Sequence, residues 1–129
     1  MDKNMKILVV DDFASMRRTV RTILKEIGFV NISEAEDGVR ALAQLKSDKF
    51  EVLITDWNMP SMDGITLVRM IRGDAELKDM IVFMVTAEAE ADHVLEAIKM
   101  GINDYIVKPF TAEVLQKKLE KVFLAKHAT

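Results

Sequence analysis

Short runs of consecutive apolar residues, rich in branched side chains, recur five times along this chain. They are Met5–Val10, Val30–Ala35, Val52–Thr55, Ile81–Val85 and Tyr105–Val107. A strand with one face in water alternates apolar and polar residues, whereas an uninterrupted apolar run fits a strand buried on both faces. The second run is more polar than the others, as expected of an edge strand. The pattern therefore predicts a parallel sheet with helices on both sides.

Each apolar run is followed by a segment with helical periodicity. The first of these segments has one apolar stripe, made of Met16, Val20, Ile23, Leu24 and Ile27. Gly28 follows it, where a left-handed cap residue belongs. The other helices are expected over Gly38–Lys46, Gly64–Arg72, Asp92–Met100 and Thr111–Ala125, the last with Thr111 as its N-cap. Five β-α units in succession predict the α/β class and one open parallel sheet joined by right-handed crossovers.

The size and charge of the chain limit the classes of protein to which it can belong. A length of 129 residues suits one compact domain, so we expect a single domain over residues 1–129 with no separate output domain. The net charge of −3 has interleaved signs, which argues against nucleic-acid binding. No apolar run reaches the roughly 18 residues of a membrane span. Together with the lack of cysteine, this predicts a cytoplasmic protein that binds no membrane.

Polar side chains follow four of the five predicted strands. Asp11 and Asp12 follow the first, Asp56 the third, Thr86 the fourth and Lys108 the fifth. Ligands of open α/β sheets bind beyond the carboxyl ends of the strands, so these side chains would meet there if the four strands are neighbours. Taken singly, each has an ordinary explanation as a helix cap, a turn residue or a solvated surface group. Three carboxylates in one place repel one another, however, and favour a hard divalent cation such as Mg²⁺.

A divalent cation beside an ammonium group indicates phosphoryl chemistry. Mg²⁺ takes one or two carboxylates and completes its shell with waters and phosphate oxygens. Lys108 would then neutralise charge on the transferred oxygens. Asp56 is the expected nucleophile because it stands alone at the end of a central strand, whereas the Asp11–Asp12 pair suits the metal.

Other classes of protein fit this pattern less well. The chain has no G-x-x-x-x-G-K-[ST] and no G-x-G-x-x-G, which a nucleotide-binding enzyme would need. A phosphatase of the haloacid-dehalogenase type needs Asp-x-Asp after its first strand, whereas Trp57 and Asn58 follow Asp56. A flavin carrier would place a Ser/Thr loop where Asp11 and Asp12 stand. An interaction module with an inactive site is disfavoured because the acidic and basic side chains are all present.

Four motifs occur in order along the chain. They are Val9-Val10-Asp11-Asp12, Ile54-Thr55-Asp56-Trp57-Asn58-Met59-Pro60 with Asp63-Gly64, Val85-Thr86-Ala87, and Lys108-Pro109-Phe110. With these motifs the chain resembles bacterial response-regulator receiver domains over essentially its whole length. Ser15–Arg18 and Glu34–Gly38 extend the likeness to the stand-alone receivers of chemotaxis. The resemblance implies a flavodoxin-like, doubly wound sheet of five strands in the order 2-1-3-4-5.

The resemblance also implies a metal site and a phosphoacceptor. Asp56 would accept a phosphoryl group from a chemotaxis histidine kinase. Mg²⁺, with Mn²⁺ as the alternative ion, would bind Asp12, Asp56 and the backbone carbonyl of Asn58, and Asp11 would help through water. Lys108 would pair with the phosphoryl oxygens. The protein would then be no enzyme in the usual sense, but a phosphoacceptor that catalyses its own phosphorylation and dephosphorylation.

Switching and partners follow from the same resemblance. Thr86 would donate its hydroxyl to a phosphoryl oxygen, and Tyr105 would be the switch aromatic that turns inward when Thr86 moves. Asn58 and Glu88 would tune the lifetime of the phosphate, with solvated loop residues as their ordinary alternative. The implied downstream partner of this monomer is the flagellar motor switch protein, and a phosphatase fits the scheme. The motor switch protein would bind the expected helix Asp92–Met100, the strand Tyr105–Val107 and the helix Thr111–Ala125. A stand-alone receiver that shuttles or stores phosphate for another phosphorelay stays open.

Overall fold

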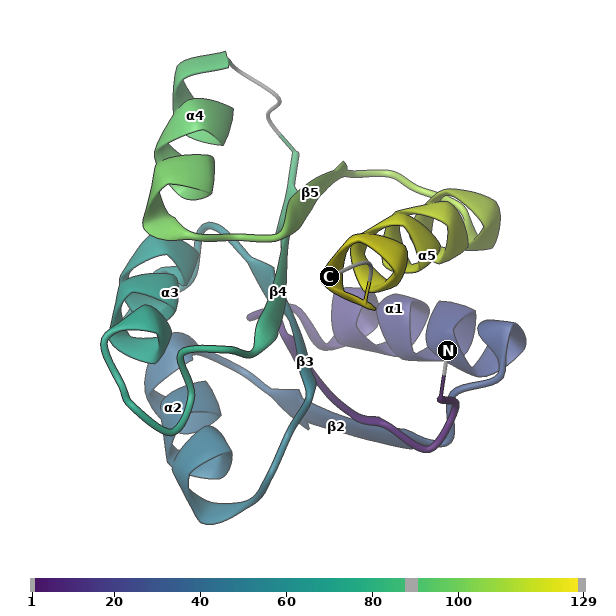
Figure 1. The fold of residues 1–129 in the computed structure, drawn as a ribbon, viewed down its shortest axis with the longest axis horizontal. Coiled ribbons are helices and arrows are strands. Elements are labelled where there is room, and N and C mark those ends of the chain that lie inside the picture. The colour runs from purple at the N-terminus through teal and green to yellow at the C-terminus, as the bar shows by residue number, and fades with distance from the viewer. Residues whose placement is uncertain (1, 88–90, 128–129) are drawn as a thin grey trace.

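The computed structural model describes residues 2–87 and 91–127, in which strands and helices alternate along the chain (Figure 1). In chain order these are β1 (Lys6–Val10), α1 (Ala14–Ile27), β2 (Asn31–Ala35), α2 (Gly38–Ser47), β3 (Val52–Asp56), α3 (Gly64–Arg72), β4 (Ile81–Thr86), α4 (Ala91–Met100), β5 (Asp104–Val107) and α5 (Ala112–His127). All paired strands are parallel, in the order β2-β1-β3-β4-β5. The predicted α/β class, the doubly wound topology and the strand order are confirmed.

Helices cover both faces of the sheet. Figure 1 shows α1 and α5 side by side on one face, and α2, α3 and α4 on the other. Each face has its own apolar cluster. Leu8 and Val10 of β1 contribute to the cluster on the α2–α4 side, whereas Ile7 and Val9 contribute to the cluster under α1 and α5. Successive side chains of a strand point to opposite faces, so two covered faces require an uninterrupted apolar run.

The helix Gly64–Arg72 was predicted with both ends as observed, and the predicted ends of the other elements lie within two residues of the observed ones. The sequence pattern places Val30 in the second strand, but this residue is 64% exposed and β2 begins at Asn31. The helix expected from Thr111 begins at Ala112, and Thr111 is its cap, since its hydroxyl oxygen accepts the Val114 N–H at 3.3 Å. Gly28 has φ of +121°, which confirms the left-handed cap after α1. None of the described helices combines the length and the apolar character that crossing a membrane requires.

Candidate functional site

Three carboxylates meet at the carboxyl ends of β1 and β3. Asp11 and Asp12 directly follow β1, Asp56 is the last residue of β3, and these two strands are neighbours. One carboxylate oxygen from each residue lies within 4.8 Å of the other two. Asp11 and Asp56 are buried, at 3% and 9% exposed, whereas Asp12 is exposed. The expectation that these side chains converge at one edge of the sheet is met.

Lys108 joins the acidic cluster from the end of β5. Its Nζ lies 3.1 Å from Oδ2 of Asp11 and 3.4 Å from Oδ1 of Asp56. Backbone donors hold both buried carboxylates as well, because the Phe13 N–H donates to Asp11 Oδ1 at 3.0 Å and the Trp57 N–H donates to Asp56 Oδ1 at 2.8 Å. The carboxylates of Asp11 and Asp56 are therefore held in a defined arrangement around the Lys108 ammonium group.

The site changes the acidity of the Asp56 carboxyl group. Burial raises the pKa of Asp56 above its usual value, the Lys108 ammonium lowers it, and the Asp11 carboxylate raises it again, with burial the largest cause. Burial and the like charge of Asp11 disfavour the ionised form of Asp56, and the Lys108 ammonium offsets this only in part. The metal-free protein thus carries a destabilised anion at the position of the expected nucleophile.

We expect Asp56→Asn to make the metal-free protein more stable at neutral pH, by an amount that shrinks in acid. An unfolded Asp titrates near about 3.9. Because the folded pKa of Asp56 is higher, the folded state binds more protons between the two values, and stability falls as the pH rises through that window. The variant lacks this group, so its advantage should grow with pH and then level off, at on the order of 1 kcal/mol.

Urea melts in a chelating buffer at stepped pH measure this difference. The lowered pKa values of the exposed Asp48 and Glu113 carboxyls, each set first by its lysine partner, occur in both proteins and cancel in the comparison. A stability difference that stays constant between acid and neutral pH would contradict the prediction.

Of the remaining predicted site residues, Thr86, Asn58 and Tyr105 lie within the described part of the chain. Thr86 ends β4 and is buried, and it directly follows Val85, which pairs with Asp56 in the sheet. Its carbonyl oxygen accepts the Lys108 N–H at 2.8 Å. Asn58 is exposed in the loop after β3. Tyr105 is partly buried in the edge strand β5, and Glu88 lies outside the described residues.

Two contacts around the site were not predicted from the sequence. The Lys118 ammonium lies 4.5 Å from the centre of the Tyr105 ring and 3.2 Å from Oδ1 of Asp104. Arg17 on α1 donates from Nη1 to the backbone carbonyl of Asp11 at 2.7 Å. Both depend on how a helix packs against the sheet, and no local motif signals either one.

A third unpredicted feature is the approach of α3 to the site. Gly64 begins α3, and a Cβ placed there would lie 2.3 Å from the backbone oxygen of Asp56. Its N–H donates to the Trp57 carbonyl at 2.8 Å. The Asp63-Gly64 pair belongs to one of the four sequence motifs, so the sequence does mark this position. The motif does not show that glycine is needed there because α3 approaches the Asp56 backbone closely.

The donor set of the cluster suits a hard divalent cation. All three acidic side chains offer oxygen, the ligand type that Mg²⁺ prefers, and among the described residues no histidine or cysteine joins them in a metal-binding group. Asp12 is exposed and has no side-chain hydrogen bond or ion pair within the described part of the chain, so its oxygens face solvent without competition. Mg²⁺ keeps several of its waters when bound, and an open rim of this kind accommodates them.

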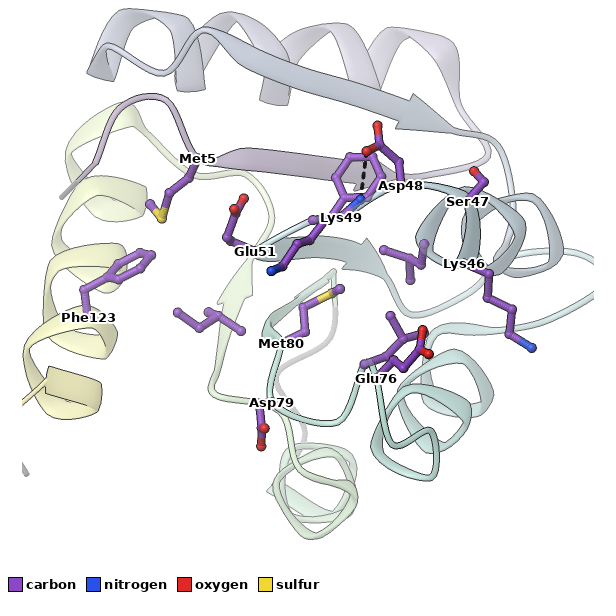
Figure 2. A pocket seen from close by; sticks show the side chains of 14 residues that line it. Met5, Lys46, Ser47, Asp48, Lys49, Glu51, Glu76, Asp79, Met80 and Phe123 are labelled. Atoms are coloured by element: carbon purple, nitrogen blue, oxygen red, sulfur yellow. Dashed lines mark hydrogen bonds between the residues drawn. The ribbon is translucent and has the colours of Figure 1, made fainter.

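A cleft of about 830 Å³ lies at the opposite edge of the sheet (Figure 2). Residues that precede strands line it, among them Met5 before β1, Glu51 before β3 and Met80 before β4. Figure 2 shows charged side chains of both signs at its rim, including Lys49 and Glu76. The cleft shares no residue with the acidic cluster, and ligands of open α/β sheets bind at the carboxyl ends, so the cluster is the candidate site.

Comparison with known proteins agrees with this geometry. Residues 7–120 match the family model described as the response regulator receiver domain. Chemotaxis protein CheY-3 of Vibrio cholerae serotype O1 is 54% identical over 123 residues, which cover 95% of each chain. Chemotaxis protein CheY of Pseudomonas aeruginosa is 55% identical over 119 residues, covering 92% of this chain and 96% of the other. The solved structure of the chemotaxis response regulator CheY4 of Vibrio cholerae superposes with a TM-score of 0.85 at 35% identity, over 92% of this chain and 98% of that one.

The family model, the two relatives and the solved structure all extend across the strands that carry the acidic cluster. This chain belongs to the response regulator receiver domain family.

Proposed function

We propose that the chain is a single-domain response regulator of chemotaxis that carries a phosphoryl group on Asp56. The observation that carries the proposal is the junction of three carboxylates with the Lys108 ammonium at the carboxyl edge of the sheet. The similarity of this chain to two chemotaxis receivers, over nearly their whole length, supports a role in chemotaxis signalling. The histidine kinase that donates the phosphoryl group and the motor switch that reads it would both meet the chain in the cytoplasm.

The reaction uses one oxygen of Asp56 as the nucleophile. This oxygen attacks the phosphorus atom of a phosphohistidine, the P–N bond breaks, and the imidazole leaves with the bonding electrons. Asp56 then holds the phosphoryl group as an acyl phosphate, which water can later hydrolyse. Lys108, already 3.4 Å from Asp56, would turn from the carboxylate to the phosphoryl oxygens and neutralise their charge.

A bound Mg²⁺ would neutralise charge on the transferred oxygens. In our proposal Asp12 and Asp56 hold it directly, with the carbonyl of Asn58, and Asp11 supports it. Asp11 already accepts hydrogen bonds from Phe13 and Lys108, which leaves the exposed Asp12 as the freer ligand. The cation also explains why two further acids can stand beside the nucleophile, since it offsets their repulsion.

The output surface of the proposal is the face formed by α4, β5 and α5. Large apolar side chains are exposed on these elements: Leu95 and Ile98 on α4, Val107 on β5, and Val114 and Leu124 on α5. Exposed apolar side chains on adjoining elements favour a protein partner. Tyr105 lies in β5, one of these three elements, so a change in its position would alter the surface presented to the flagellar motor switch protein.

The direct test combines Mg²⁺ and acetyl phosphate with the purified protein. We expect the intact mass to rise by one phosphoryl group per chain, only when Mg²⁺ is present. The phosphorylated protein should then bind the motor switch protein more tightly than the unmodified one. Phosphorylation without a gain in that affinity would favour the phosphate shuttle over the motor regulator.

Thr86→Ala should separate phosphorylation from output. Thr86 follows the residue that pairs with Asp56 in the sheet, and it is not the nucleophile, so the variant should still gain the mass of one phosphoryl group. A coupling of typical size would give wild type a roughly 5–150-fold gain in partner affinity, whereas the variant should gain less than about twofold. The physical reason is that the hydroxyl would report the phosphoryl group to Tyr105.

Thr19→Ala is the matched control, because within the described residues the Thr19 hydroxyl donates only to the Ser15 carbonyl of its own helix. This control should keep the full wild-type gain. If phosphorylated Thr86→Ala bound the partner as tightly as phosphorylated wild type, the coupling role of Thr86 would be wrong.

A further inference from the structure

The position of Asp12 is set by its backbone. Its exposed carboxylate has no side-chain hydrogen bond or ion pair within residues 2–87 and 91–127, in contrast to Asp11 and Asp56. A cation ligand has to be held at the right place before the ion binds, or ordering it costs binding energy. A contact that fixes the backbone around Asp12 therefore strengthens the binding of the cation by the Asp12 carboxylate.

Arg17 is the side chain that holds the peptide between Asp11 and Asp12. Its Nη1 donates to the Asp11 carbonyl oxygen at 2.7 Å, and that carbonyl shares a planar peptide unit with the Asp12 nitrogen. The Asp11 N–H is tied to the Ala35 carbonyl at 3.2 Å by the sheet. The sheet thus fixes the backbone nitrogen of Asp11. Arg17 fixes its backbone carbonyl group, to which the nitrogen of Asp12 is bonded.

Arg17 is itself held by the edge strand. Its Nε lies 3.2 Å from Oε1 of Glu34 on β2, and its side chain is only 14% exposed. Arg21, one turn further along α1, pairs with the other oxygen of Glu34 at 3.0 Å. A guanidinium can engage Glu34 and the Asp11 carbonyl together because its donors form a rigid fork. Arg21 binds the same Glu34 side chain, but its hydrogen bond is not to the Asp11–Asp12 backbone. Arg21 is therefore a suitable control for Arg17.

We propose that Arg17 is a positioning residue that fixes the Asp11–Asp12 peptide and so prepares Asp12 to bind the divalent cation. The inference deepens the proposed function, on which it rests. Arg17 touches neither the nucleophile nor the cation. It acts through the backbone, from an anchor on a strand that contributes no carboxylate to the cluster.

The sign of the effect distinguishes positioning from simple electrostatics. Arg17 is cationic, so if it acted only through its charge, its removal would relieve repulsion and tighten Mg²⁺ binding. If it positions Asp12, its removal weakens binding. Loss of groups that orient metal ligands typically costs about 10–100-fold in metal affinity.

The experiment compares Arg17→Gln with Arg21→Gln in Mg²⁺ titrations of the unphosphorylated protein. Trp57, the only tryptophan, follows Asp56 and serves as the fluorescent probe, with calorimetry as the independent measurement. All titrations are run at one fixed pH, so that the surroundings of Trp57, whose ring lies 5.3 Å from that of His93, are the same in every variant. We expect Arg17→Gln to weaken Mg²⁺ binding at least about tenfold. Arg21→Gln, which removes the same charge from the same anchor, should leave the affinity unchanged or slightly higher.

Urea melts without Mg²⁺ accompany each titration, because a merely structural role would lower stability without changing the affinity of the folded protein. Arg17→Lys guards against a variant that does not fold; it keeps the charge but cannot engage both partners, and should also weaken binding. If both Arg17 variants bound Mg²⁺ as tightly as wild type or more tightly, the positioning role of Arg17 would be overturned, but the proposed function would not. A wild-type protein that does not bind Mg²⁺ would instead overturn the proposed function.

Discussion

Asp56→Asn should gain no phosphoryl group under conditions in which wild type gains one. An amide oxygen is far too poor a nucleophile to displace the leaving group from phosphorus, and no neighbouring carboxylate is placed to replace Asp56. Asp11 is engaged by Phe13 and Lys108, and Asp12 is the exposed ligand of the proposed cation. The measurement is intact mass after treatment with acetyl phosphate and Mg²⁺.

The variant should fold, so its failure would report chemistry. The side-chain oxygen of the introduced asparagine can still accept the Trp57 N–H, and Lys108 keeps its contact with Asp11 at 3.1 Å. Asp63→Asn is the matched control, because it removes a carboxylate that only caps α3, where it accepts the Thr66 N–H at 2.8 Å. Asparagine caps helices about as well as aspartate, so this control should be phosphorylated like wild type. A phosphoryl group found on Asp56→Asn would show that another residue is the acceptor.

The fold was predictable because its signal is carried by many residues at once. Two covered faces demand runs such as Val52–Thr55, and each run by itself indicates a parallel strand. The edge strand β2 was the weakest prediction, since only one side of an edge strand is paired and its sequence is more polar. Its start was misplaced at Val30, a residue that lies outside β2 and is largely exposed.

The acidic cluster was predictable from the same logic. Parallel strands bring their carboxyl ends to one edge, so residues that follow neighbouring strands meet there whatever their separation in sequence. Asp11 and Lys108 are 97 positions apart and follow strands that β3 and β4 separate, and yet the two side chains form an ion pair at the carboxyl edge. The strand order that places β1 beside β3 came from the family resemblance and not from the pattern of residues.

The supporting contacts were not predictable in this way. Arg17 reaches the Asp11 carbonyl only because α1 packs at a particular angle, and its charge gave no hint, since Arg18 carries the same charge at the next position. Lys118 covers Tyr105 from α5 by the same kind of helix-to-sheet contact. Sequence periodicity says which face of a helix is buried, but not which backbone atom a long side chain on its border will reach.

Gly64→Ala should be strongly destabilising and should disturb the site together with the fold. The added Cβ would lie 2.3 Å from the Asp56 carbonyl oxygen and 2.9 Å from the Met84 sulfur. A methionine side chain can move, but a backbone oxygen in a central strand cannot move without displacing Asp56. Overpacking typically costs about 1–3 kcal/mol, and a clash with fixed backbone belongs at or above the upper end of that range. We therefore expect a loss of about 3 kcal/mol in urea melts.

Gly73→Ala is the control, and the contrast between the two glycines identifies the cause. Gly73 follows α3 with φ of −86°, it is exposed, and the nearest atom to an added Cβ is the Arg69 carbonyl oxygen at 3.4 Å. Neither glycine has a positive φ, so conformational freedom is not what either position requires. Gly73→Ala should be neutral or stabilise by up to about 1 kcal/mol, because alanine restricts the unfolded chain.

If Gly64→Ala were as stable as this control and still accepted a phosphoryl group, the close approach of α3 to Asp56 would not be what demands glycine there. If it is unstable as expected, the folded fraction should also bind Mg²⁺ more weakly than wild type, since the backbone oxygen that must yield belongs to the nucleophile itself.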